Sequence, residues 1–393
     1  MSKQLHLANL LLAWATWPRA LDRSFTILHS ESSTGWGGQE IRVFTEMEAM
    51  RQRGHRLFLA APPDSQIFQK AKEADFNPWE LNPKRILFPF TIMKLARALR
   101  RHKVQVVNPH SSADGWITSI AGRLAGTPLI VRSRHIEVDY PNRRTSYWAY
   151  GRLPHHVITT SDRISKGLIE KLRLKPDRVQ CISTGIDLEI FDASTPGTLH
   201  QELGLDANVP LVGMISVIRS WKGHNYFVEA AKIVAVRFPA VHFVVAGGGN
   251  DQRLEKIRTW ARASKLESRF HLLSHRTDVP NLLASYSVLV LPSTGHEGIP
   301  QIILQSHAMA CPVVGTTVGG IPEVVADEKS GLLVPTKDSP ALAAAINRLL
   351  ENKTFRSKLA TRGQAMVKAS HSEEHMCLQL ETLYQRYLSG NID

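Results

Sequence analysis

The chain has 393 residues, of which 43% are hydrophobic and 21% are charged. That length exceeds one ordinary core and fits two domains of roughly 150–200 residues each. The formal charge is +13, and residues 1–190 hold most of it, with 28 Lys and Arg against 17 Asp and Glu. A positively charged first half of this kind can bind anionic lipid or an acidic glycan, or it can simply form a solvated surface. The chain lacks the Lys/Arg runs with interleaved aromatics that favour nucleic acid, so we expect no nucleic-acid partner.

Three cysteines are too few and too scattered for a disulfide framework or a CxxC metal site, which predicts a protein of the reducing cytoplasm. Residues 6–18 are apolar but too short to span a bilayer. We therefore expect an N-terminal extension over residues 1–24, either an interfacial anchor or loosely ordered. The protein is predicted to be soluble, or peripheral on the inner face of the cell membrane.

From Phe25 onward, short apolar runs alternate with helical patterns, which predicts parallel sheets with helices on both faces. The first series, over residues 25–195, has predicted strands at 25–28, 57–60, 104–107, 129–131 and 156–159. Its first strand leads into Gly37 and Gly38, glycines that suit a tight strand-to-helix turn close to a ligand.

A second series, over residues 206–370, has predicted strands at 211–217, 242–246, 270–273, 288–291, 312–315 and 331–334. A Ser/Thr/Pro/Gly-rich stretch at 193–199 indicates the linker between the two series. The amphipathic segment within residues 371–393 is expected to pack back on the first domain. The predicted fold is α/β, with two Rossmann-like doubly wound domains facing across a cleft.

Glu297 lies on a Gly/Pro loop between an apolar strand and a helix that begins near Gln301. The residues that join the carboxylate to this helix are Gly298, Ile299 and Pro300. The start of the helix directs free N–H groups and the positive end of its dipole toward the cleft, which suits a diphosphate. Gln305 follows one turn into the helix, on the cleft side.

Arg219 and Lys222 follow the first strand of the second domain. A diphosphate needs cations where no metal is supplied, and the chain has no Asp-x-Asp motif, so we expect no essential metal and no cofactor. Gly247 and Gly248 end the next strand without the spacing of a dinucleotide fingerprint.

In the first domain, two histidines follow neighbouring predicted strands. His135 comes after the strand at 129–131, and His110 comes after the strand at 104–107. A lone histidine is more often structural, but ligands bind at the carboxyl ends of strands in open α/β sheets. Both histidines are therefore candidate site residues.

Taken in order over roughly residues 25–390, these motifs resemble the retaining family 4 glycosyltransferases of GT-B architecture. The resemblance implies transfer of a sugar from a nucleotide diphosphate donor, with retention of anomeric configuration and without an essential metal. It implies that Glu297 contacts the transferred sugar and that His135 lies beside the reacting centre. Lys222 would hold the diphosphate, together with Arg219, which stands two residues from the family's usual arginine position.

The resemblance also implies donor contacts from Gly37, Gly38, Gly247, Gly248 and, mainly through its backbone, Arg276, and an acceptor-side position for His110. Two positions depart from the family pattern. Gln305 stands where the family has a glutamate on the ribose hydroxyls, and Val217 stands where it has an arginine. A glutamine keeps one carbonyl acceptor, so it can still bind ribose, without a charge-assisted bond.

The basic first domain is expected to bind the acceptor, and its charge favours an anionic or membrane-borne one, such as a lipid-linked or lipopolysaccharide-core glycan. This predicts a role in cell-envelope polysaccharide or lipopolysaccharide synthesis, with an anionic membrane surface as a partner. Two alternatives stay open. One is a sugar-nucleotide epimerase or phosphorylase of the same architecture, and the other is a non-catalytic glycan- or nucleotide-sugar-binding protein.

Overall fold

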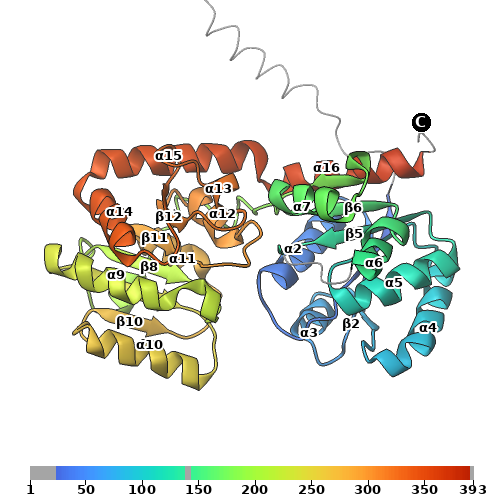
Figure 1. Ribbon diagram of the computed structural model, residues 1–393, viewed down its shortest axis with the longest axis horizontal. Helices are drawn as coiled ribbons and strands as arrows, with labels where there is room; N and C mark the ends of the chain where they lie inside the picture. The colour runs from blue at the N-terminus through green and yellow to red at the C-terminus, as the bar shows by residue number, and fades with distance from the viewer. Residues whose placement is uncertain (1–23, 138–142, 390–393) are drawn as a thin grey trace, which may run out of the picture.

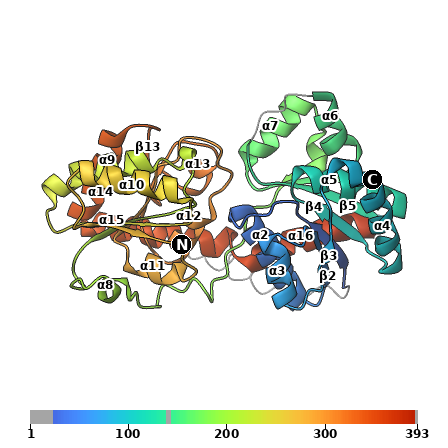
Figure 2. The ribbon, with the colours of Figure 1, turned by 90° about the horizontal axis from the view of Figure 1, so that it is seen from below.

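The computed structural model describes residues 24–137 and 143–389. Two parallel sheets form two domains that lie side by side, with the first domain on the right in Figures 1 and 2. The extension expected over residues 1–24 lies outside the described residues, apart from Ser24. Among the described residues, none of the helices combines the length and apolarity that crossing a membrane requires.

The first domain is built on a sheet in the order β3-β2-β1-β4-β5-β6-β7, and the neighbouring strands pair in parallel. Its strands are β1 (Thr26–Ser30), β2 (Arg56–Ala61), β3 (Trp79–Glu80), β4 (Val106–Pro109), β5 (Leu129–Arg134), β6 (His156–Thr159) and β7 (Val179–Cys181). The main helices are α2 (Gly38–Gln52), α3 (Gln66–Glu73), α4 (Phe88–Arg101), α5 (Ser112–Ala125), α6 (Arg143–Tyr147) and α7 (Asp162–Leu172).

The second domain has a sheet in the order β10-β9-β8-β11-β12-β13, again parallel. Its strands are β8 (Leu211–Ile215), β9 (His242–Ala246), β10 (Phe270–Leu273), β11 (Val288–Leu291), β12 (Val313–Thr316) and β13 (Leu332–Val334). Its helices are α8 (Leu199–Glu202), α9 (His224–Arg237), α10 (Asp251–Ala263), α11 (Val279–Ser285), α12 (Gln301–Ala308), α13 (Ile321–Val324), α14 (Ser339–Glu351) and α15 (Lys353–Ser370).

Apolar side chains on both faces of each sheet are buried beneath helices, as the near-continuous apolar strands require. The strand order reverses between β1 and β4 in the first sheet and between β8 and β11 in the second. Loops that leave the carboxyl ends of strands at such switch points form the ligand-binding crevice of doubly wound folds. The loops after β1 and β8 are therefore the first places to look for a site.

The predicted strands are all present, four of them with identical bounds and the others with ends shifted by at most three residues. The sequence prediction missed two strands of the first sheet. β3 has two residues and pairs only with β2 at the sheet edge, and β7 has three half-buried residues. Both are too short to show a hydrophobic period, since their strand conformation is set by the neighbour they pair with.

The last helix, α16 (Glu373–Leu388), runs back over the first domain and packs against α2 (Figure 1). Its apolar side chains Met376, Leu380 and Tyr384 are buried in one cluster with Met47 of α2. Burial alone would raise the pKa of Glu381, but hydrogen bonds from His55 and Arg53 lower it to about 2. The carboxyl end of the chain thus completes the core of the first domain.

Candidate functional site

The centre of the candidate site is an ion pair between two loops of the second domain. Lys222 follows β8, and its Nζ lies 2.6 Å from Oε1 of Glu297, which follows β11. Ser293 donates from Oγ to the same carboxylate oxygen at 2.6 Å. Glu297 is buried, and within the described residues its other oxygen, Oε2, has no hydrogen-bond partner in the protein. That oxygen can accept from a ligand.

The backbone of the loop fixes this carboxylate in place. His296, just before Glu297, has a φ of 57°, a left-handed conformation that costs energy for a residue with a side chain. Its ring packs edge-on against Trp221 at 5.4 Å. The Thr294 amide donates to the Trp221 carbonyl oxygen at 2.7 Å. The loops after β8 and β11 are therefore tied together around the ion pair.

Gly223, directly after Lys222, allows the tight turn of the loop after β8. It has a φ of +75°, and a Cβ there would lie 1.9 Å from the Pro292 carbonyl oxygen. Only glycine allows the chain to turn this closely against the end of β11, and the turn brings Lys222 to Glu297. Arg219 is exposed, with its guanidinium 5.3 Å above the Trp221 ring.

The two domains meet at this loop. Gln301, the first residue of α12, donates from Nε2 to the Gly38 carbonyl oxygen of the first domain at 2.9 Å. A Cβ on Gly298 would lie 2.1 Å from the His135 carbonyl oxygen, so the two backbones are in contact. The structure thus brings residues predicted on both walls of the cleft, Gly38, His135, Gly298 and Gln301, to one interface.

A second contact across the interface lies at the start of α7. The Glu323 carboxylate, from α13, accepts from the backbone amides of Asp162 at 2.8 Å and Arg163 at 3.0 Å. These are orphan donors of the first turn of a helix, where a negative charge is stabilising. Glu323 therefore helps to hold the two domains in this arrangement.

The remaining donor-side candidates lie in the second domain, apart from Gly37 in the first. Pro300 precedes α12 and half-buried Ile299 packs on the core beneath it. Gln305 is half-buried one turn into α12, and in the part of the chain that the structure describes its side chain has no hydrogen-bond partner. Gly247 abuts the Ser216 carbonyl, whereas a Cβ on Gly248 would meet nothing closer than 3.8 Å. Gly37 caps α2, and its amide donates to the Glu40 carboxylate at 2.8 Å.

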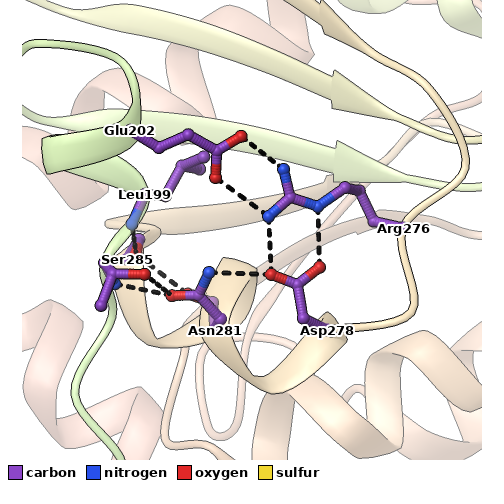
Figure 3. A network of polar contacts seen from close by, with 7 residues as sticks. Leu199, Glu202, Arg276, Asp278, Asn281 and Ser285 are labelled. Carbon is purple, nitrogen blue, oxygen red and sulfur yellow. Dashed lines mark hydrogen bonds and ion pairs between the residues drawn. The ribbon is translucent and has the colours of Figure 1, made fainter.

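Arg276 has a different environment, shown in Figure 3. Its guanidinium pairs with Glu202 at 2.5 Å and with Asp278 at 2.6 Å, so it joins α8 to the start of α11. Hydrogen bonds from Arg276 hold the pKa of Asp278 well below its usual range. The side chain is thus committed to structure, and only the backbone of Arg276 is free for a ligand.

His110 lies between two other histidines. It is buried, and both ring nitrogens are occupied, Nδ1 by His135 Nε2 at 2.8 Å and Nε2 by His29 Nδ1 at 2.9 Å. The ring of His110 is thus engaged between two other histidines, and the acceptor-side position expected from the sequence stays a prediction. Burial, and then the neighbouring His135, lower the pKa of His110 well below its usual value. Burial, followed by Arg42, does the same to the pKa of His135.

Comparison with known proteins assigns the family. Residues 209–352 match the family model of glycosyl transferases group 1, and residues 36–190 match that of glycosyltransferase family 4. The chain is 30% identical over 281 residues to a D-inositol 3-phosphate glycosyltransferase of Frankia alni, covering 65% of this chain and 68% of the relative. The chain belongs to glycosyltransferase family 4.

Other similarities agree with that assignment. Over 277 residues the chain is 29% identical to the UDP-Gal:alpha-D-GlcNAc-diphosphoundecaprenol alpha-1,3-galactosyltransferase of Escherichia coli, covering 67% of this chain and 71% of the relative. A solved glycosyltransferase of Rickettsia africae superposes with a TM-score of 0.86 at 19% identity, covering 94% of this chain and 100% of that one. Anabaena HepE in complex with UDP superposes with a TM-score of 0.81 at 21% identity, covering 91% and 99%. The predicted GT-B fold and the activity class, a glycosyltransferase, are confirmed.

Two residues of this family 4 glycosyltransferase were missed from sequence, His29 beside the candidate histidines and Glu323 at the domain interface. His29 is the last residue but one of β1, so the rule that pointed to His110 and His135 could have found it. No sequence pattern pointed to Glu323, because it lies in a four-residue helix of the second domain and its partners lie in the first. Among the residues that the structure describes, no three His, Cys, Asp or Glu side chains gather as a metal-ligand set.

Proposed function

We propose that this enzyme transfers a sugar from a nucleotide diphosphate donor to a glycan or lipid-linked acceptor, with retention of configuration and without an essential metal. The observation that carries the proposal is the Lys222–Glu297 pair, at 2.6 Å, on loops that follow the two switch-point strands of the second domain. The E. coli relative is named for a UDP-sugar donor, and solved Anabaena structures hold UDP and UDP-glucose. These names support a nucleotide-sugar donor here.

The chemistry of the pocket fits such a donor. Lys222, with Arg219 and the amino end of α12, supplies positive charge where a leaving diphosphate gains negative charge. The free Oε2 of Glu297 can accept from sugar hydroxyls through charge-assisted hydrogen bonds. Gln305, one turn into α12, offers a neutral acceptor to the ribose. In this proposal the second domain binds the donor and the first domain binds the acceptor.

Retention is proposed to follow front-face attack. The acceptor oxygen forms its bond to the anomeric carbon on the face from which the phosphate departs. The leaving phosphate oxygen keeps the electrons of the broken bond and takes the proton of the acceptor hydroxyl. The protein supplies fixed charge and position for this step rather than a covalent intermediate.

A surface of the first domain supports a membrane-borne acceptor. Ile86, in the 3-10 turn just before α4, is 84% exposed, and Phe90 and Met93 in the first turns of α4 are 77% and 46% exposed. The stripe continues into exposed Arg97 and Arg100. Apolar side chains next to basic ones suit the headgroup region of an anionic membrane. In both views α4 lies at the end of the first domain away from the second (Figures 1 and 2).

The membrane proposal is tested by co-sedimentation with vesicles, with and without anionic lipid, at low and high salt. Binding to anionic vesicles that salt weakens is expected, and Phe90→Glu is expected to reduce it. Val236→Glu is the matched control, since Val236 is an apolar side chain of the second domain that is 82% exposed. Equal loss of binding in both variants, or no lipid dependence, contradicts the proposal and favours a soluble acceptor.

The catalytic proposal is tested with donors. UDP-, GDP- and ADP-sugars are screened by thermal shift, because a ligand of the folded state raises the melting temperature with concentration. The stabilising donor is then assayed for release of nucleotide diphosphate, with and without EDTA, and NMR of the product gives the anomeric configuration. Binding without any turnover would favour a non-catalytic binding protein, and an epimerised donor would favour an epimerase. Such a role belongs, we propose, to cell-envelope polysaccharide or lipopolysaccharide synthesis in the cytoplasm.

A further inference from the structure

Three histidines form a hydrogen-bonded chain in the first domain. His29 lies near the end of β1, His110 follows β4 and His135 follows β5, and these three strands are neighbours in the sheet. His29 Nδ1 lies 2.9 Å from His110 Nε2, and His110 Nδ1 lies 2.8 Å from His135 Nε2. The rings pack on one another with centroids 5.2 Å and 5.1 Å apart. All three side chains are buried.

The two ends of this row of three histidines have different surroundings. His29 Nε2 faces the buried carboxylate of Glu46 in α2, 4.0 Å from Oε1, and neither atom has a hydrogen-bond partner. The other carboxylate oxygen pairs with Arg42 Nε at 3.1 Å. At the far end, His135 reaches the domain interface, where its backbone contacts Gly298. Over the described ranges, 24–137 and 143–389, no side chain or backbone group is bonded to His135 Nδ1.

Burial and the nitrogen–nitrogen contacts together fix the number and the places of the protons on the three histidines. Burial, the largest cause in each case, lowers the pKa of all three rings, so each is neutral near pH 7 and carries one proton. Each nitrogen–nitrogen contact holds one proton. The third proton must then sit at one end, on His29 Nε2 or on His135 Nδ1. A carboxylate 4.0 Å from His29 Nε2 attracts an N–H and repels a lone pair, so it favours the first arrangement.

We propose that Glu46, through His29 and His110, holds His135 protonated on Nε2 with a bare Nδ1 at the domain interface, so that His135 accepts a hydrogen bond from a sugar hydroxyl. Glu46, His29 and His110 are then positioning residues for His135. A histidine held in the opposite tautomer would donate to a phosphate instead. That His135 meets a sugar at all rests on the proposed function, but its tautomer does not.

Other charged and titratable groups surround the chain. Arg42 of α2 and Arg132 and Arg134 of β5 act on His135, and Tyr384 and Cys377 of α16 lie close enough to Glu46 to interact with it. The three arginines lower the affinity of the rings for an extra proton. They disfavour imidazolium forms and leave the neutral tautomers as the forms to be distinguished.

The test is long-range ¹H–¹⁵N correlation NMR of the full chain labelled with ¹⁵N-histidine, at pH 7.5, with His135 assigned from His135→Gln. The wild-type spectrum should show His135 protonated on Nε2. Glu46→Gln and His29→Phe should each move His135 toward the Nδ1-protonated pattern. His55→Phe is the matched control, because His55 is another buried histidine of this domain, 2.8 Å from the Glu381 carboxylate. It should leave His135 unchanged.

A wild-type His135 protonated on Nδ1 would overturn the proposal. So would an unchanged His135 pattern in both folded variants, since a merely structural role for Glu46 alters stability without altering the tautomer. If Glu46→Gln fails to fold, His29→Phe alone decides. The spectra need no donor or acceptor, so failure of the proposed transfer reaction and failure of this inference are separate results.

Discussion

Gln301, the first residue of α12, donates from Nε2 to the Gly38 carbonyl oxygen at the start of α2, 2.9 Å away in the other domain. The amino ends of two helices therefore meet where the domains join. Helix amino ends carry free N–H groups and partial positive charge. Each domain thus contributes one such end to the place where a diphosphate is proposed to bind.

Glu297→Ala is expected to lower turnover by roughly 100- to 1000-fold, the usual loss when one fixed polar contact to a transition state is removed. The melting temperature should change little. Lys222 is only half-buried, so its charge can be solvated by water when the partner carboxylate is removed. The measurement is donor turnover beside thermal unfolding. Glu255→Ala, which removes an exposed carboxylate of the same domain, is the control and should leave turnover unchanged. Full activity of Glu297→Ala would remove Glu297 from the mechanism.

Lys222→Ala is expected to weaken donor binding and lower turnover, because the proposed diphosphate loses a cation that the loop after β8 holds in place. Lys222→Arg should recover part of the binding, since the charge returns with a different shape. Nucleotide affinity by calorimetry and the KM for the donor report on this. Equal affinities in the wild type and Lys222→Ala would exclude a phosphate contact.

Gly298→Ala is expected to separate the domains. The added Cβ would stand 2.1 Å from the His135 carbonyl oxygen, and a backbone carbonyl cannot rotate away as a flexible side chain does. Gly295→Ala in the same loop is the matched control, because its Cβ would meet nothing within 4 Å. Small-angle scattering should show a larger radius of gyration for Gly298→Ala alone, together with reduced turnover. Indistinguishable scattering of the two variants would show that the contact does not hold the domains.

Gln305→Glu is expected to tighten nucleotide binding about fivefold without changing the product, since a charge-assisted hydrogen bond to ribose exceeds a neutral one by roughly 1 kcal/mol. Gln252→Glu, an exposed glutamine of the same domain, adds the same charge elsewhere as a control. Calorimetry with the nucleotide diphosphate measures both. A matching gain in Gln252→Glu would assign the effect to net charge rather than to a ribose contact.

Glu31 makes the stability of the first domain depend on pH. Burial, and then the Asp114 carboxyl, raise the pKa of Glu31 to about 7 from its ordinary value of 4.5. Between these two pH values the folded state holds a proton that the unfolded chain has released, so this contribution to the free energy of unfolding is lost as pH rises toward 7. Glutamine does not titrate, so the free energy of unfolding of Glu31→Gln should not fall in this way as pH rises.

Relative to the wild type, Glu31→Gln should therefore gain roughly 2–3 kcal/mol between pH 4.5 and pH 8. The change with pH in the difference between the two free energies of unfolding reports on the titration of Glu31. The difference at a single pH does not, because the glutamine also changes the bonds to Gln39 and Ser33. Urea unfolding at four pH values measures it, with exposed Glu255→Gln as the control. A difference between Glu31→Gln and the wild type that does not vary with pH would mean that Glu31 titrates normally in the folded chain.

Local patterns were sufficient for much of this architecture. The strands at β6, β9, β10 and β11 matched their predicted bounds, because each is an apolar run flanked by turn residues. Local rules also pointed to four residues at the domain interface, Gly38, His135, Gly298 and Gln301, since loops after parallel strands gather at one edge of a sheet. They did not point to Glu323. His110 shows where this reasoning stopped, because strand-end position does not reveal that both its ring nitrogens are occupied.

The sequence by itself determined two doubly wound domains and the loop that carries Glu297, because hydrophobic period and turn chemistry are local properties. The glycosyltransferase family came from the resemblance of its motifs. Only the tertiary structure decided that Lys222 pairs with Glu297 and that Arg276 is committed to Glu202 and Asp278. It also decided that Glu46 stands at the end of the histidine chain. These partners lie far apart in the chain, and their choice depends on burial and charge that arise when separate elements pack together.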